Sequence, residues 1–431
     1  MRKSVWTWRH ILVLCLHALP LTRALGAEDT IYQVAFEQLL QSGQLELNSD
    51  DAQVNQQHAH EPGESESDIS GEGRSSPWLD GPICTTYIPR LQSELCVYTN
   101  TSFAGERGIS LFTTPQIAKE FDSLHLRNNP AFRRDRDAET NVFSETWYTK
   151  DSPSKGVGMF ARQDLNRSDP ITSSTPVLLA YKEAVLPKPE REEFLRHAIG
   201  RLPPATGNAY RFLATMYHDP AFLMQDIASA NSFEMDIAGT PHLAVMPAPS
   251  RINHDCAPNS IFVSNSTALT HTVRAARAIA KDEEITIAYT NPLEPFAQRQ
   301  KYLHDSFGFE CSCARCQRGE TGDAVLDEMV TLQRSLSKWA DPTSTSSTKQ
   351  AERLIRIHQQ EGLMGYVDPA YCLAALMYNS VGSERGAKKY VKLCIEGIEL
   401  RLGKGAADLP QWRKMLDSPR GHWSWMRRKQ G

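Results

Sequence analysis

Arg251-Ile-Asn-His-Asp-Cys-Ala-Pro-Asn259 is the stretch that decides how this chain is interpreted, together with Cys311-Ser-Cys-Ala-Arg-Cys316 further along. One cysteine in the first segment and three in the second supply four thiolates, the number that completes a tetrahedral structural zinc site. The sequence therefore predicts one zinc ion bound by Cys256, Cys311, Cys313 and Cys316. Because Asn253 and His254 stand just before the first of these cysteines, the metal would also fix the backbone that carries them.

Two further motifs complete an ordered set. Gly156-Val-Gly-Met-Phe160 predicts a glycine turn that leads into a strand, and Glu284-Ile-Thr-Ile-Ala-Tyr289 alternates as a half-buried strand does. Each motif alone is a weak signal, since buried structural cysteines and core tyrosines are common. The order G-x-G, R-x-N-H-x-C-x-P-N, E-x-T-x-x-Y and cysteine-rich tail resembles the SET-domain methyltransferases.

The resemblance implies an α+β fold: a SET β-fold with an inserted helical subdomain, a zinc-binding post-SET tail and an all-α C-terminal region. It implies S-adenosylmethionine as cofactor and a protein lysine as substrate. By the same resemblance Tyr289 is the catalytic residue. The implied cofactor-binding residues come from all the motifs and include the asparagine of Asn231-Ser-Phe: Gly156, Gly158, Met159, Asn231, Asn253, His254 and Phe309.

Within that family the match is closest to the SMYD group, which has the same C-x-C-x-x-C tail and a helical region after it. This chain lacks the cysteines and histidines of the MYND finger that the group carries, so the finger's partner-binding role does not carry over. Phe307 stands where SMYD proteins usually have a tyrosine. The lost hydroxyl either changes how many methyl groups are added or is a neutral substitution.

Other readings stay open at this stage. A non-catalytic SET scaffold that binds a partner through its helical tail would keep the fold without the chemistry. His254 alone could be a hydrogen-bonded core histidine, and Asn259 could only cap its loop. A doubly wound methyltransferase is disfavoured, because no G-x-G-x-x-G joins an early strand to a helix.

The composition is that of a globular protein: 431 residues, 40% hydrophobic and 23% charged, with a net charge of -4. This balance gives no reason to expect direct nucleic-acid binding. Arg2, Lys3 and Arg9 precede the apolar run Ile11–Leu21 and a small-residue site at 24–27, so residues 1–26 are predicted to be a signal peptide. The expected location is the secretory pathway or outside the cell, with the nucleus or cytoplasm as the alternative. No membrane span is expected in the mature chain.

The rest of the chain divides by composition. The expected units are a short helix and disordered linker at 27–82, an N-terminal flanking region at 83–142, the SET domain at 143–290, a post-SET zinc region at 291–318 and a helical region at 322–431. Within them, a helix is expected at 113–120 from its threonine cap and early proline, a strand at 143–148, and helices at 189–227 from apolar residues at helical spacing. Segments 370–379 and 387–400 resemble one tetratricopeptide-type hairpin that turns near Gly382 and offers a surface for a protein partner.

The remaining cysteines and the sequons bear on the compartment. Cys372 and Cys394 lie at similar heights on the predicted hairpin, so if both point at the seam between the helices they would form a disulfide in an oxidising compartment and remain two buried thiols in the cytosol. Cys84 and Cys96 could close a small loop. The N-x-S/T sequons at Asn100, Asn166 and Asn265 add little on their own, because chance alone supplies such matches.

Overall fold

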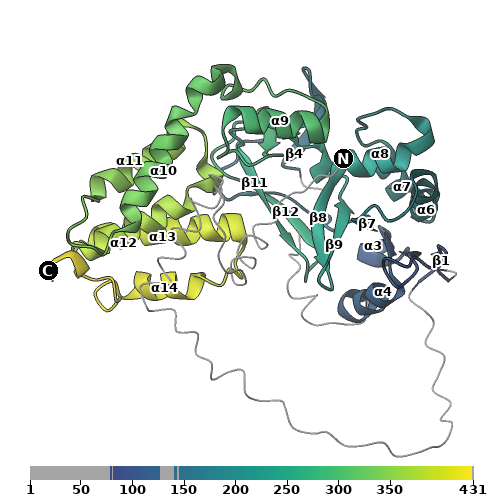
Figure 1. The fold of residues 1–431 in the computed structure, drawn as a ribbon, viewed down its shortest axis with the longest axis horizontal. Helices are drawn as coiled ribbons and strands as arrows, with labels where there is room; N and C mark the ends of the chain where they lie inside the picture. Colours follow the sequence, from purple (N-terminus) through teal and green to yellow (C-terminus); the bar gives the residue numbers. More distant parts are fainter. Residues whose placement is uncertain (1–77, 80, 127–139, 143–144, 430–431) are drawn as a thin grey trace, which may run out of the picture.

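The computed structural model describes residues 78–126 and 140–429, apart from positions 80, 143 and 144. The predicted signal peptide, the short helix that follows it and nearly all of the predicted linker lie outside the described residues. Within them, short strands gather in the middle of the chain and helices follow to the C-terminus (Figure 1). The α+β class is therefore confirmed.

Three sheets form the β part. The largest has the strand order β1 (Ile83–Cys84), β2 (Cys96–Asn100), β3 (Ile109–Thr113), β7 (Leu178–Tyr181), β9 (Thr240–Val245), β8 (Ser232–Ile237). The second has the order β10 (Asn253–His254), β13 (Glu284–Ile287), β5 (Gly156–Ala161), β4 (Trp147–Ser152), and the third β11 (Ser260–Asn265), β12 (Thr270–Ala275), β6 (Pro170–Ser174). Residues 83–113 thus contribute strands to the same sheet as residues 232–245.

The large sheet is buried on both faces, because successive side chains on a strand point to opposite sides. Leu111 and Leu179 face a core shared with Met159 of the second sheet, which is fully buried. Their neighbours on the strands, Phe112 and Leu178, face a second core that the inserted helices cover. This double burial explains why these strands read as apolar runs rather than as alternating patterns.

The inserted helices lie between β7 and β8, as the apolar spacing predicted: α6 (Lys188–Gly200), α7 (Pro204–Arg211) and α8 (Leu223–Asn231). The buried carboxylate of Glu192 accepts from the backbone N–H groups of Met224 and Gln225 at the start of α8, each at 3.0 Å. A negative charge at a helix N-terminus is favourable. The α8 helix runs directly into β8, so Asn231 is held between a helix and a strand.

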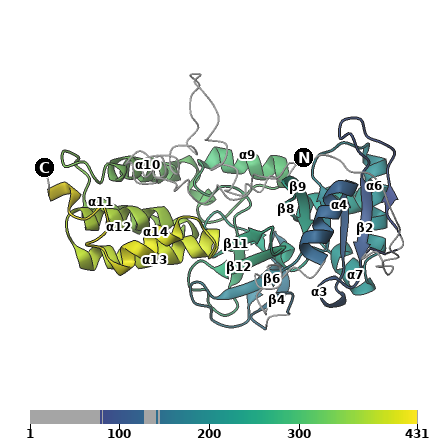
Figure 2. The ribbon, with the colours of Figure 1, turned by 90° about the horizontal axis from the view of Figure 1, so that it is seen from below.

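The C-terminal part is helical, and Figures 1 and 2 show it at the opposite end of the molecule from α6 and α7. Its helices are α9 (Phe296–Phe307), α10 (Ala324–Ser337), α11 (Thr348–Gln360), α12 (Asp368–Ser380), α13 (Glu384–Leu402) and α14 (Leu409–Asp417). The predicted hairpin is confirmed: α12 and α13 meet at Gly382, whose φ of +77° suits glycine. Cys372 and Cys394 form a disulfide across it, with Cα atoms 5.0 Å apart.

The remaining elements are short. Near the described N-terminus lie α3 (Phe103–Glu106) and α4 (Pro115–Phe121); α4 begins after Thr114 with a proline in its first turn, as predicted. Single turns of 3-10 or π helix occupy Asp122–Leu126, Pro220–Phe222, Pro249–Arg251, Cys316–Gly322, Met364–Tyr366 and Arg427–Lys429. None of the described helices has the length and apolar character needed to cross a membrane.

Two strand boundaries differ from the sequence prediction. The strand expected to run from Glu284 to Tyr289 ends at Ile287, because the Tyr289 backbone N–H donates to the His254 side chain instead of to a neighbouring strand. The strand expected at 143–148 begins only at Trp147 and continues to Ser152, where it turns into β5. Local patterns place strands well but their ends poorly, because tertiary contacts decide where pairing stops.

Candidate active site

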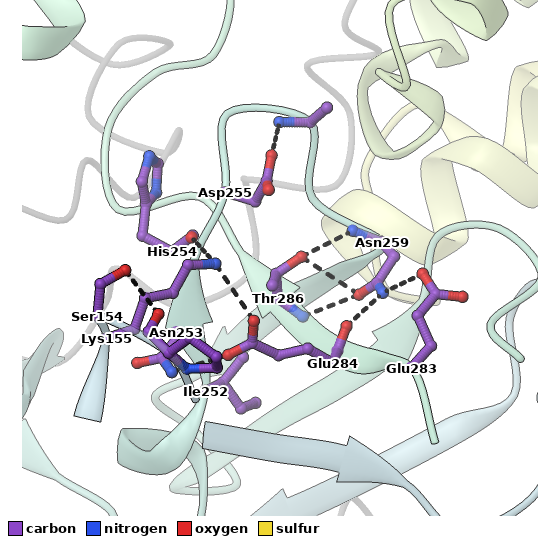
Figure 3. A network of polar contacts seen from close by, with 12 residues as sticks. Ser154, Lys155, Ile252, Asn253, His254, Asp255, Asn259, Glu283, Glu284 and Thr286 are labelled. Atoms are coloured by element: carbon purple, nitrogen blue, oxygen red, sulfur yellow. Dashed lines mark hydrogen bonds and ion pairs between the residues drawn. The ribbon is translucent and has the colours of Figure 1, made fainter. Parts of the chain in front are cut away.

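The site is built on two short strands that lie side by side. β10 runs parallel to β13, with Asn253 opposite Thr286 and His254 opposite Ile287. The buried Asn259 holds the loop after β10 against β13: its Oδ1 accepts from the Thr286 backbone N–H at 2.8 Å, and its Nδ2 donates to the Glu284 carbonyl at 2.8 Å (Figure 3). Asn259 therefore does more than cap its own loop, because it sets the register of the two strands that carry the site.

Gly158, on β5, lies against the side chains of Asn253 and Glu284 in the same sheet. A Cβ atom at this position would lie 2.8 Å from Asn253 Nδ2 and 2.6 Å from Glu284 Oε1, so any side chain here would displace both groups. Gly156 has a φ of +74°, which a glycine adopts without strain. The G-x-G turn thus leaves one face of β5 without side chains beside Asn253.

Charged groups orient Asn253 from the other side. Its Nδ2 donates to Glu284 Oε1 at 2.9 Å, and Lys155 Nζ lies 3.2 Å from Glu284 Oε2 (Figure 3). Lys155 Nζ also lies 3.5 Å from the His254 carbonyl oxygen. The carboxylate of Glu284 therefore fixes which way the Asn253 amide points, with its nitrogen toward β13.

His254 has a defined tautomer. Its Nδ1 accepts from the Tyr289 backbone N–H at 2.9 Å, so in the neutral ring the proton is on Nε2. Nε2 lies 3.3 Å from the Cys256 sulfur and donates to it. Burial lowers the pKa of His254 to about 3, so the ring is neutral at ordinary pH. The imidazole thereby connects the cysteines to Tyr289 without carrying a charge.

Tyr289 is held at both ends. Its hydroxyl donates to the Ile252 carbonyl at 2.7 Å, and its backbone is fixed by His254. Its ring centroid lies 4.9 Å from Phe307 and 6.5 Å from Phe309. Burial raises the pKa of Tyr289 well above its usual value, so the hydroxyl stays protonated at neutral pH.

A small cavity lies beside Tyr289. Tyr289 and Phe307 line it together with Phe233 and Phe262, and Asn231 lines it from the inserted helices. The Asn231 amide donates to the carbonyls of Ala214 and Ile227 at 2.7 and 2.8 Å, which fixes its side chain at the end of α8. The structure therefore brings Asn231 to the same cavity as Tyr289, while Asn253, Gly158 and Phe309 lie around His254.

The four predicted metal-binding cysteines also come together. The sulfurs of Cys256, Cys311, Cys313 and Cys316 all lie within 4.8 Å of one another, and those of Cys256 and Cys316 are 3.5 Å apart. Zinc–sulfur bonds of about 2.3 Å in a tetrahedron place the sulfurs about 3.8 Å apart. These four thiols are free, whereas the other four described cysteines are paired. The arrangement can therefore hold one metal ion.

Two buried arginines flank the cysteines. Arg315 Nη1 donates to the Cys256 carbonyl at 2.8 Å, and Arg299 is only 2% exposed. Burial alone would lower the pKa of Arg299, but interaction with Cys256 and Cys316 raises it. A divalent ion with four thiolates carries two negative charges, which two guanidinium groups can offset.

Sequence reasoning missed the charged residues of the site: Lys155, Glu284, Arg299 and Arg315. A lysine before a glycine turn and a glutamate at the start of a strand read as ordinary surface charges. Only Glu284 had a usable signal, because it opens the motif that ends at Tyr289.

Comparison with known proteins agrees with this geometry. Residues 156–290 match the family model described as SET domain. The Histone-lysine N-methyltransferase set5 of Schizosaccharomyces pombe is 26% identical over 282 residues, which are 63% of this chain and 83% of that protein. The Histone-lysine N-methyltransferase SMYD3 of Homo sapiens is 39% identical over 114 residues, 25% of this chain and 26% of that protein.

A third relative, the N-lysine methyltransferase SMYD2 of Homo sapiens, is 25% identical over 221 residues, 50% of this chain. The chain thus spans most of the S. pombe relative but only 26% and 47% of the two human relatives. The stretch that matches the family model, residues 156–290, contains the G-x-G turn, the Asn-His strand and Tyr289.

Proposed function

We propose that this chain, which contains a SET domain at residues 156–290, transfers methyl groups from S-adenosylmethionine to the side-chain amine of a lysine in a protein substrate. Support comes from the relatives, which are named as lysine methyltransferases. One structural observation carries the proposal further. A small cavity is lined by the aromatic residues Phe233, Phe262, Tyr289 and Phe307 and by Ile252, the residue directly before the Asn253–His254 strand.

The residues around β10 suit S-adenosylmethionine. Gly158 leaves backbone uncovered next to Asn253, where a Cβ would collide with the amide. The amide of Asn253 and the ring of Phe309, whose centroid is 6.1 Å from His254, offer hydrogen bonding and stacking to a nucleoside. The cofactor would be held by Gly156, Gly158, Met159, Asn231, Asn253, His254 and Phe309. Met159 would contribute indirectly, by supporting its strand from the core.

The bound cofactor would supply an electrophilic methyl group on a positively charged sulfur. The protein must then present a neutral amine in line with it, which is mainly a task of alignment. A lysine has an unperturbed pKa of about 10.4, and an apolar channel favours its neutral form. Phe233, Phe262 and Phe307 exclude water, and Tyr289, which stays protonated, orients the amine through its hydroxyl oxygen.

We also propose that the ion held by Cys256, Cys311, Cys313 and Cys316 is a structural zinc. All four positions would be filled by sulfur, which leaves none open for chemistry. Its role would be to fix β10 through Cys256 and to position Phe309 two residues before Cys311.

A single experiment separates the enzyme from a non-catalytic scaffold. Purified full-length protein is titrated with S-adenosylmethionine by calorimetry, and then incubated with the methyl-labelled cofactor and mixed cellular proteins, with lysine methylation read by mass spectrometry. We expect saturable binding and new methyl-lysine. Binding without any methyl-lysine would favour the scaffold, and the absence of binding would refute the proposed function.

Two wider proposals rest on less specific features. The N-terminal segment would deliver the chain to the secretory pathway, and the two disulfides support this because such bonds persist in oxidising compartments. The α12–α13 hairpin would bind a protein partner, as tetratricopeptide-type hairpins do. Localisation of a tagged full-length protein tests the first proposal. Affinity capture tests the second, by comparing the unchanged chain with a chain altered within residues 322–431.

A further inference from the structure

The sequons of this chain fall at structurally different places. Asn265 is exposed at the end of β11, in the turn that leads to β12. Asn166 is exposed in the loop between β5 and β6. Asn100, by contrast, is only 8% exposed, and as the last residue of β2 it is paired with Ile109 of β3 in the large sheet. An asparagine carries a bulky glycan only where the folded surface leaves room for it.

The local geometry at Asn265 suits an acceptor. Its Oδ1 accepts from the Ala268 backbone N–H at 3.0 Å, which makes a turn through the sequon Asn265-Ser-Thr267. Both Asn265 and Thr267 are exposed there. A glycan at this hairpin tip would extend into solvent without disturbing the pairing of β11 with β12, which ends at Asn265 and Thr270.

Asn166 is also in a turn, closed by Asp169: the Asn166 N–H donates to Asp169 Oδ2 at 2.7 Å, and the Asp169 N–H donates to the Asn166 carbonyl at 3.1 Å. Both bonds use backbone groups of Asn166, so the exposed side-chain amide is not needed to hold the turn. The side chain of the adjacent Arg167 anchors the loop, since it donates to the Met364 carbonyl at 2.9 Å.

The cysteines supply an independent observation on the compartment. Cys84–Cys96 and Cys372–Cys394 are bridged in two different parts of the fold, with Cα distances of 4.0 and 5.0 Å. The four thiols of the candidate metal site stay free. This division is what oxidative folding around a bound metal would produce, and N-linked glycans are added where such disulfides form.

We propose that the chain carries N-linked glycans on Asn265 and Asn166, and none on Asn100. The inference rests on the proposed secretory location but not on the proposed methyltransferase activity, because it concerns two exposed surface turns. It changes how the protein should be produced, since material from a host without glycosylation would lack two solubilising surface groups.

The test uses the full chain with its N-terminal segment, expressed in a eukaryotic host. Peptide-N-glycosidase should increase its gel mobility, and mass spectrometry should find the resulting Asn-to-Asp change at 166 and 265 but not at 100. Thr267→Ala should abolish the glycan on Asn265 while leaving the asparagine and its turn in place. Ser266→Ala is the matched control, because it keeps the sequon.

Identical mobility before and after the glycosidase would overturn the proposal. A glycan on Asn100 would overturn its structural basis, and a glycan on only one of the two exposed asparagines would overturn the assignment of the other. If S-adenosylmethionine binding failed while both glycans were present, the function would be refuted and the glycosylation would stand.

Discussion

At the scale of single residues, two backbone hydrogen bonds position Tyr289: its hydroxyl donates to the Ile252 carbonyl, and its N–H donates to His254 Nδ1. Asn253, His254 and Tyr289 could be singled out because they stand in motifs with fixed spacing. Their partners could not, since the Ile252 carbonyl and the Tyr289 N–H are backbone groups that every residue possesses. Glu284 and Lys155 come together only because β5, β10 and β13 are adjacent, which is a property of the fold.

The first prediction concerns the Tyr289 hydroxyl. Tyr289→Phe should reduce methyl transfer about a hundredfold or more, because misplacing a reacting amine has effects of that size. Its affinity for S-adenosylmethionine should stay near that of the unchanged protein, since the hydroxyl points to the Ile252 carbonyl on the cavity side. Transfer rates on an accepted substrate and calorimetry measure the two effects. Tyr302→Phe is the control, because it removes the same hydroxyl group from a different tyrosine, whose ring packs against Phe307.

The second prediction separates cofactor binding from transfer. Asn253→Ala should weaken S-adenosylmethionine binding about tenfold or more, because it removes an amide held by a charged Glu284. Calorimetry measures the change, and thermal unfolding checks that the fold survives. If this variant bound the cofactor as tightly as the unchanged protein, the assignment of Asn253 would be wrong.

At the scale of elements, helices and hairpins followed from their periodicity, whereas sheet order did not. The α12–α13 hairpin is local, so apolar spacing and a glycine turn predict it. The neighbours of β7 in its sheet are β3 and β9, which are far from it along the chain. No local pattern encodes such pairing, because it depends on long-range packing. For the same reason, no local pattern showed that residues 83–113, which were expected to flank the SET domain, contribute β1, β2 and β3 to this sheet.

The third prediction concerns the cysteine cluster as an element. The folded protein should hold about one equivalent of zinc, and Cys256→Ser should lose it, together with cofactor binding, because Cys256 accepts from His254 and precedes the Asn259 network. Elemental analysis and calorimetry measure both. Cys394→Ala, which changes a cysteine outside the cluster, should keep the metal. Soluble, folded protein free of zinc would contradict the prediction.

The fourth prediction concerns the disulfide of the hairpin. Replacing Cys372 and Cys394 together by alanine should lower the free energy of unfolding by about 2–4 kcal/mol, the usual effect of closing a loop of this kind. Urea unfolding in oxidising buffer measures the loss. A reductant should destabilise the unchanged protein more than the double variant. Equal midpoints for the two proteins in oxidising buffer would show that the bridge does not contribute.

At the scale of the whole molecule, one buried carboxylate connects the helical region to the candidate site. Glu361, at the end of α11, accepts from Arg315 Nε at 3.2 Å and from Arg318 Nη1 at 2.9 Å, and both arginines belong to the cysteine-rich segment. Arg315 also donates to the Pro292 and Cys256 carbonyls at 2.8 Å. Sequence patterns do not predict this link, because charges near a helix end usually face solvent.

The last prediction tests that link by contrast with an exposed ion pair. Glu361→Ala should lower the free energy of unfolding by about 3–5 kcal/mol, because it leaves the buried Arg315 without its partner. Glu328→Ala removes the carboxylate of the Arg353–Glu328 pair, in which both side chains are 41% exposed, and should lower it by about 1 kcal/mol or less. Urea unfolding of both variants measures the difference, and similar losses would contradict the role given to Glu361.

The pH dependence of the same carboxylate gives a second measurement. Burial alone would raise the pKa of Glu361, but Arg318 and Arg315 outweigh it and hold the pKa below its usual value. The stabilisation is therefore fully present above the unfolded-state pKa of about 4.3 and is lost as the pH falls through the lower folded-state value. The stability difference between the unchanged protein and Glu361→Ala should consequently shrink below that pH. A difference that stayed constant on acidification would mean that packing of the side chain, rather than its charge, joins the helical region to the site.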